Sequence, residues 1–197
     1  KSQTEGLINA HQETTLNFKK VISRIEKVIL TLNPRLDKKY VKRLSIFTAI
    51  NSRKHELDPR LLIAIMNTES SFNQKAVSAT NDISIAQINL KVWTPQFFKE
   101  KTGLPLDVSR LKNDESYAIS RMCLILKYYK TKFPNDKEWF ARYHSSTPKH
   151  KNLYRYKLVK SAKKIRHYGK NLLKEMPPLS DIKQAIHDER NLASLTK

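Results

Sequence analysis

The chain has 197 residues, of which only 3 are glycine, and it carries a formal net charge of +20 at pH 7. This length can bury a sizeable core in one domain with extensions, and the composition favours a mainly helical fold. The charge predicts attraction to polyanions such as nucleic acids, anionic lipids or acidic cell-wall polymers. No apolar run approaches the roughly 20 residues that span a bilayer, so no transmembrane segment is predicted.

The first part of the chain predicts a loose start and two helices. Residues 1–12 are polar and are expected to be loosely held. Apolar residues recur at helical spacing over residues 14–32, which predicts an amphipathic helix that Pro34 ends. Asp37 is then expected to cap a second helix that continues to about Lys54.

The next predicted helix carries the first candidate catalytic residue. Asp58 is a suitable N-cap and Pro59 suits the first helical position. The residues that follow are almost wholly apolar, which indicates a buried helix with Glu69 at its far end. Burial would raise the pKa of this carboxyl and suit it to act as a general acid. The plain alternative is an exposed glutamate in a last helical turn.

Beyond Glu69 the pattern changes to a short strand or extended turn over residues 83–89, and then returns to helices. A short helix is expected to begin near Pro95, and a longer one after Asn113 or Asp114. Asp136 is expected to begin another short helix.

The C-terminal part predicts a basic helix over residues 151–168, stopped by Gly169, and a last helix that begins near Ser180. The last helix would carry Ile182, Ile186 and Leu192. No Asp or Glu stands between Glu138 and Glu175. This basic segment is either a solvated face or a real anion-binding surface.

Other classes of site have little support. The single cysteine, Cys123, lies among apolar residues and is expected to be a buried small side chain with no catalytic role. The six histidines show no spacing typical of a metal site, so no metal is predicted. No helix-turn-helix, zinc-ligand or RNP-like pattern is present, so specific nucleic-acid binding is a distant alternative.

Three ordered motifs resemble the soluble lytic transglycosylase (SLT) family, which is lysozyme-like and cleaves peptidoglycan. They are ESSFN at residues 69–73, KAVS at residues 75–78 and DISIAQIN at residues 82–89. The resemblance spans residues 57–159 and implies a mainly α, goose-type lysozyme-like domain. Ser84 stands where the family usually has glycine, a residue that permits close approach of backbone to ligand.

A second resemblance lies at residues 141–148, ARYHSSTP. This segment is similar to the A-Y-N-A-G turn of the family, and closer to the version associated with conjugation and type IV secretion. The resemblance implies that the Tyr143 hydroxyl donates a hydrogen bond to catalytic Glu69. His144 replaces the commoner asparagine, and Tyr154 is a weaker candidate for closing the cleft floor.

The resemblance also implies the residues that contact the substrate. Ser70 would support the carboxyl, and Ser78 would place a hydroxyl beside the sugar. Gln87 and Asn89 would offer amide groups to N-acetyl and hydroxyl groups. Glu69 and Tyr143 form the implied catalytic set, with no metal and no organic cofactor required.

The reaction that the resemblance implies is cleavage of the β-1,4 bond between N-acetylmuramic acid and N-acetylglucosamine, with formation of a 1,6-anhydro ring. One alternative is a muramidase that hydrolyses the same bond. Asp82 could be its second carboxylate, although Asn81-Asp82 is also an ordinary turn pair. Because the resemblance implies a reaction that needs only one glutamate, Asp82 stays outside the catalytic set. A second alternative is a cationic cell-wall-binding protein without turnover.

The expected organisation is an N-terminal extension helix at residues 1–36, a lysozyme-like transglycosylase domain at residues 37–170, and a tail at residues 171–197. Peptidoglycan glycan strands are the expected substrate, with a secretion-machinery or other cell-envelope protein as a further partner. The expected location is the periplasm or cell envelope, with a leader that is not present in this chain.

Overall fold

A computed structural model describes residues 2–168, 172–182, 184 and 186–187, with side chains from residue 12 onward. Its elements, in chain order, are α1 Ser2–Leu32, α2 Lys38–His55, α3 Pro59–Ser70, β1 Asp82–Ile83, β2 Ile88–Asn89, α4 Pro95–Thr102, α5 Val108–Asn113, α6 Glu115–Lys132, the 3₁₀ helix η1 Trp139–Tyr143, α7 Pro148–Lys164 and α8 Leu172–Glu175. The predicted mainly helical fold is confirmed.

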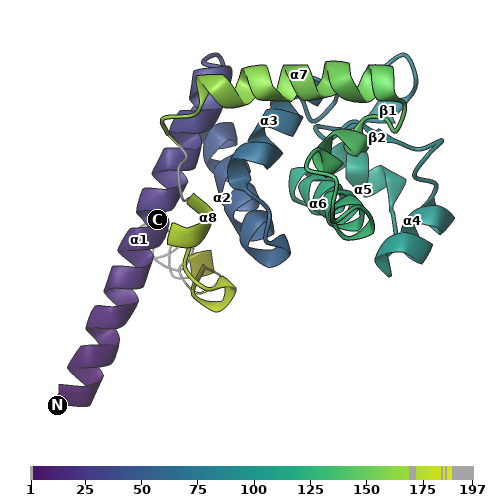
Figure 1. Cartoon of the computed structure of the whole chain (residues 1–197). Helices are drawn as coiled ribbons and strands as arrows, with labels where there is room; N and C mark the ends of the chain where they lie inside the picture. Colours follow the sequence, from purple (N-terminus) through teal and green to yellow (C-terminus); the bar gives the residue numbers. More distant parts are fainter. Residues whose placement is uncertain (1, 169–171, 183, 185, 188–197) are drawn as a thin grey trace.

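Helix α3 is central to the arrangement and packs against α7, α2 and α1 (Figure 1). It begins where predicted, because the Asp58 side chain accepts a hydrogen bond from the Arg60 backbone N–H at 2.8 Å and Pro59 is the first helical residue. Its middle is buried on all sides, as its apolar sequence predicts. Ser71 ends it in the left-handed conformation, with φ of 52°. Glu69 therefore lies in the last turn.

Helix α1 is longer than predicted. Its backbone is helical from Ser2, whereas the sequence predicts a helix only from residue 14. The physical reason is that the packed part of α1, with Val21, Ile25 and Ile29 buried against α2, already forms a helical nucleus. Each added residue then gains a backbone hydrogen bond without a new nucleation cost. The N-terminal part of α1 extends beyond the rest of the molecule (Figure 1).

Helix α2 packs against α6 as well as against α1. Helix α6 begins at Glu115, directly after the predicted cap, Asp114. Cys123 on α6 is fully buried, as expected. The short helix α5 was not predicted. Its sequence carries little apolar periodicity, and the side chain of Asp107 caps it while Leu111 is its one buried residue.

Helix α7 lies along the outer edge of the molecule (Figure 1). It runs from Pro148 to Lys164, so it begins and ends earlier than predicted. Pro148 at the first helical position explains the earlier start, and the expected stop at Gly169 lies outside the described residues. Residues 179–182, 184 and 186–187 are helical, which agrees with the predicted last helix, whereas Leu192 is outside the described part.

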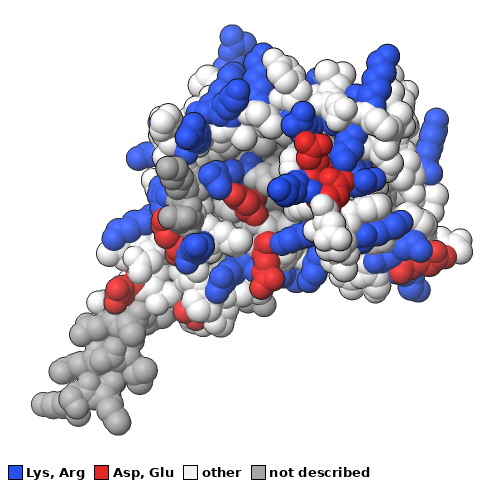
Figure 2. All heavy atoms as spheres, viewed as in Figure 1, with Lys and Arg blue, Asp and Glu red and all other residues white. Residues whose placement is uncertain are grey.

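Lysine and arginine side chains are spread over the face seen in Figure 2, and acidic side chains lie among them in smaller number. This distribution fits the net charge of +20. Among the residues that the structure describes, no helix is both long enough and apolar enough to cross a membrane.

Candidate active site

The side chain of Glu69 is largely buried, with 10% of its surface exposed. Burial raises the pKa of its carboxyl from 4.5 to about 7. The Tyr154 hydroxyl opposes this rise in pKa, and the charge of Asp82 adds to it. Within the described part of the chain, the Oε1 atom of Glu69 has no hydrogen-bond partner. The carboxyl can therefore be either protonated or ionised near neutral pH.

A cavity of about 240 Å³ opens beside this carboxyl, and we call it the Glu69 cleft. Its walls come from the end of α3, the β1–β2 hairpin, η1 and the start of α7. The lining residues are Glu69, Thr80, Asp82, Gln87, Ile88, Asn89, Trp93, Ile125, Tyr143, His144, Ser145 and His150. The cleft thus gathers polar side chains from segments about 80 residues apart in the chain.

The hairpin presents two amides to the cleft. Strands β1 and β2 are antiparallel, with Asp82 opposite Asn89. Gln87 donates its side-chain N–H groups to the backbone oxygens of Ala76 and Ser84, at 3.0 and 2.9 Å. The side-chain oxygen of Asn89 accepts from the Lys91 and Val92 N–H groups. These bonds fix both amides while leaving the Gln87 oxygen and the Asn89 N–H groups for a ligand.

Ser84 occupies the turn of this hairpin with φ of 73°. Glycine adopts this left-handed conformation without strain, whereas in a residue with a Cβ the conformation costs free energy because the Cβ approaches the backbone carbonyl oxygen. A glycine at this position would fit the observed backbone without this strain. The Ser84 hydroxyl accepts a hydrogen bond from the Ala86 N–H at 3.3 Å.

Two of the predicted substrate residues have other contacts. The Ser70 hydroxyl lies 3.1 Å from the Met66 oxygen and 2.9 Å from the Ile85 oxygen, and so ties the end of α3 to the hairpin. The Ser78 hydroxyl donates to the Asp82 carboxylate at 2.9 Å. Neither serine is among the residues that line the Glu69 cleft. The structure therefore brings Gln87 and Asn89 to the cleft, whereas Ser70 and Ser78 do not line it.

Asp82 lies in the same cleft as Glu69. One of its oxygens, Oδ2, accepts hydrogen bonds from Ser78 and from Thr80, the latter at 2.7 Å. Its other oxygen, Oδ1, is buried and has no partner among the described residues. The sequence analysis leaves Asp82 outside the catalytic set because the resemblance implies a single catalytic glutamate, and the structure adds that Asp82 lines the cleft.

The expected hydrogen bond from Tyr143 to Glu69 is not made. The Tyr143 hydroxyl donates to the Ala86 backbone oxygen at 2.7 Å, and a hydroxyl carries only one hydrogen to donate. Tyr154 is the tyrosine whose hydroxyl interacts with the Glu69 carboxyl and lowers its pKa. No hydrogen bond of ordinary geometry joins Tyr154 to Glu69, and the buried Tyr154 hydroxyl has no other partner in the described part.

His144 completes the surroundings of the carboxyl. Its ring stacks on Tyr154 with centroids 4.7 Å apart and an interplanar angle of 12°. Its Nδ1 atom lies 3.9 Å from Glu69 Oε1, which is too long for a hydrogen bond. Burial lowers the pKa of His144, so the ring is neutral at neutral pH. No group of three or more His, Cys, Asp or Glu side chains in the described residues could hold a metal ion.

Comparison with known proteins agrees with this geometry. Residues 47–164 match the family described as "Transglycosylase SLT domain", and this match covers more than half of the chain. It includes Glu69, the hairpin and the start of α7. A search of curated proteins found no match. The chain therefore belongs to the transglycosylase SLT domain family, whose members are lytic transglycosylases acting on peptidoglycan.

Proposed function

We propose that this protein is a lytic transglycosylase that cleaves the β-1,4 bond between N-acetylmuramic acid and N-acetylglucosamine and forms a 1,6-anhydro end. The observation that carries the proposal is the buried Glu69 carboxyl, whose pKa of about 7 lets it give and take a proton at neutral pH. A fully exposed glutamate would be ionised there and could not act first as an acid.

One carboxyl serves both steps. Protonated Glu69 donates its proton to the glycosidic oxygen, and the bond to the muramic acid anomeric carbon breaks. The N-acetyl oxygen of that sugar stabilises the positive charge that develops. Ionised Glu69 then takes the proton of the C6 hydroxyl of the same muramic acid. As it does so, the C6 oxygen bonds to the anomeric carbon and closes the ring. The proton is returned to Glu69, and no water is consumed.

The other residues have supporting roles in this proposal. Gln87 and Asn89 bind the N-acetyl and hydroxyl groups of the sugars, since their amides lie in the cleft and are fixed by backbone hydrogen bonds. Tyr143 holds the hairpin through Ala86, and the Tyr154 hydroxyl favours the ionised form of the Glu69 carboxyl. Ser70 and Ser78 act indirectly, by fixing the hairpin and Asp82.

A second candidate is hydrolysis of the same bond, and the position of Asp82 favours it. Glycosidases that hydrolyse commonly use an acid and a second carboxylate, either as nucleophile or as base. Asp82 lines the cleft with Glu69, is oriented by two hydroxyls and has a buried oxygen without a partner in the described residues.

Mass spectrometry of purified peptidoglycan digested by the protein separates the two reactions. A transglycosylase leaves anhydro-muramic ends, which are one water lighter than the reducing ends left by a hydrolase. Asp82→Asn should retain most activity in a transglycosylase and lose it in a hydrolase. Glu69→Gln should abolish turnover in both cases. Unchanged wall clearance by Glu69→Gln would instead support a binding protein without catalysis.

The proposed setting follows from the substrate. The cell wall places the protein in the periplasm or cell envelope, and residues 37–170 form the proposed catalytic domain between the two flanking regions. The R-Y-H-S-x-T-P turn at residues 142–148 supports a role beside a secretion or conjugation machine. Pull-down with components of such a machine from the same cell would test that role.

A further inference from the structure

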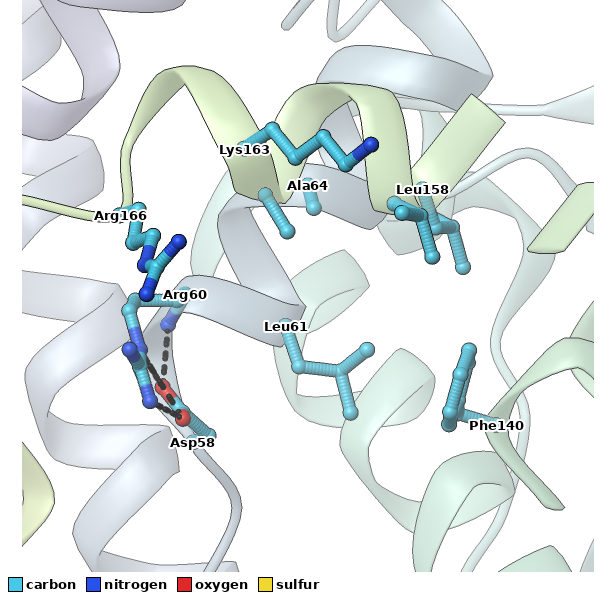
Figure 3. Close-up of a pocket in the computed structure, with 10 residues that line it drawn as sticks. Asp58, Arg60, Leu61, Ala64, Phe140, Leu158, Lys163 and Arg166 are labelled. Atoms are coloured by element: carbon cyan, nitrogen blue, oxygen red, sulfur yellow. Dashed lines mark hydrogen bonds and ion pairs between the residues drawn. The ribbon is translucent and has the colours of Figure 1, made fainter. Parts of the chain in front are cut away.

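A second cavity lies at the opposite end of α3 from Glu69, between α3, η1 and α7 (Figure 3). Its volume is about 380 Å³, and we call it the α3–α7 groove. Its apolar lining residues are Leu61, Ala64, Phe140, Leu158, Val159 and Ala162. It shares no lining residue with the Glu69 cleft, so a ligand here would leave the cleft accessible.

Positive charges border this apolar groove. Arg60 and Arg166 lie at one end, Phe140 lies at the other, and Lys163 extends along α7 above the apolar side chains (Figure 3). Asp58 is the acidic residue that lines the groove, and its carboxylate is already engaged by Arg60 at 2.6 Å.

The charge of this border is poorly balanced. No carboxylate in the described part of the chain forms an ion pair with Lys163 or Arg166, and no acidic residue occurs in the sequence between Glu138 and Glu175. The apolar part is also open, because Val159 keeps 39% of its surface exposed and Ala162 is exposed. Apolar surface next to unbalanced cations suits a ligand that carries both apolar groups and negative charge.

We propose that the α3–α7 groove binds an acidic segment of a protein partner. The segment places one or two large apolar side chains against Leu61, Phe140 and Leu158, and its carboxylates face Lys163 and Arg166. The groove has the size of a small-ligand pocket, which fits a few side chains.

Other polyanions fit this groove less well. Glycan strands and nucleic-acid phosphates could contact the cations, but they would not cover the apolar lining of the groove. An anionic bilayer would require a continuous apolar face. The exposed side of α7 is mixed instead: Leu153 and Tyr156 are exposed, and so are Lys149 and Lys160.

The test is fluorescence anisotropy on the full chain with three labelled peptides of equal length. The first carries two leucines one helical turn apart, flanked by glutamates. In the second, serines replace the leucines, and in the third, lysines replace the glutamates. The protein variants are Ala162→Trp, which fills the groove from an exposed position, and the double variant Lys163→Glu with Arg166→Glu. Lys149→Glu is the matched control, because it changes charge on α7 outside the groove.

The acidic leucine peptide should bind the wild-type protein at least about tenfold more tightly than either other peptide. Ala162→Trp should weaken that binding about tenfold or more, and the double charge variant should weaken it at least as much at low salt. Lys149→Glu should change it less than about threefold, and Glu69→Gln should not change it. Circular dichroism checks the fold; if Ala162→Trp does not fold, the surface charge variants decide.

Equal binding of the serine peptide would overturn the proposal, because only general charge attraction would remain. So would a loss of binding free energy in Lys149→Glu that is half or more of the loss in the double charge variant, because the first reverses one charge and the second reverses two. Absence of binding by the wild-type protein would also overturn it. If phosphatidylglycerol vesicles bind with the same dependence on Ala162 and Lys163 while the peptides do not, the groove takes lipid and the protein-partner assignment is wrong.

Discussion

Replacing Glu69 by glutamine is expected to stabilise the protein above neutral pH, although it removes the proposed catalytic acid. The wild-type carboxyl must ionise where only 10% of its side-chain surface is exposed. No lysine or arginine in the described part of the chain forms an ion pair with it, and His144, 3.9 Å away, is neutral at neutral pH. Glutamine has nearly the same shape and carries no charge. Function and stability are therefore expected to oppose each other at this position.

The size of the effect follows from the pKa. A rise from 4.5 to about 7 corresponds to about 3 kcal/mol, at about 1.36 kcal/mol for each pH unit. The folded protein holds this proton more tightly than the unfolded chain does. The stabilising contribution is therefore fully present below pH 4.5 and is lost as pH rises through about 7.

The assay is urea denaturation of wild type and Glu69→Gln at pH 4 and pH 9. The free energy of unfolding of the variant relative to wild type should be higher at pH 9 than at pH 4 by up to about 3 kcal/mol. Comparing the two pH values cancels any constant effect of the substitution. Glu100→Gln, at an exposed position of α4, is the control for the substitution of a glutamate by glutamine elsewhere in the chain. The same stability difference at both pH values would refute the raised pKa.

Three further predictions concern the same site. The value of kcat/KM on purified peptidoglycan should fall as pH rises above about 7, because free enzyme then loses the Glu69 proton; a rate that stays constant to pH 9 would contradict this. Ser84→Gly should raise the free energy of unfolding by about 1 kcal/mol by relieving the left-handed backbone, and a lower value in urea denaturation would be the opposite result. Tyr143→Phe should lower it by about 1 to 3 kcal/mol, because the buried Ala86 oxygen loses its donor, and an unchanged value would show that the bond is dispensable.

Much of the helical framework could be predicted from local signals. Asp37, Asp58 and Asp114 each cap the helix expected after them, and their side chains make the capping hydrogen bonds. Caps and apolar periodicity act within a few residues, so one sequence is enough to find them. The extent of α1 and the presence of α5 depend on packing and on weak propensities, and were missed.

The sequence predicts which residues lie in the cleft better than it predicts which hydrogen bonds they make. Glu69, Gln87 and Asn89 do meet in one cleft. The partner of Tyr143 was not predictable, because the direction of a hydroxyl depends on how η1 packs over the hairpin. Asp82 required the fold as well: the pairing of β1 with β2 places it opposite Asn89, and both residues line the cleft with Glu69.

The α3–α7 groove had no sequence signal. It forms between helices separated by about 100 residues, and each of its apolar members reads as an ordinary core residue. The basic run that borders it was visible in the sequence, with a solvated face and an anion-binding surface as equal interpretations. The apolar groove beside the cations is what favours the second interpretation.

The proposed mechanism requires that Glu69 keep its proton up to neutral pH. The pKa of its carboxyl can be measured directly by NMR titration of the full chain carrying ¹³C-labelled glutamate, with the signal assigned by its loss in Glu69→Gln. We expect a midpoint of about 7 for this one carboxyl. A midpoint near the ordinary 4.5 would contradict it, because the group would then be ionised before it could donate a proton.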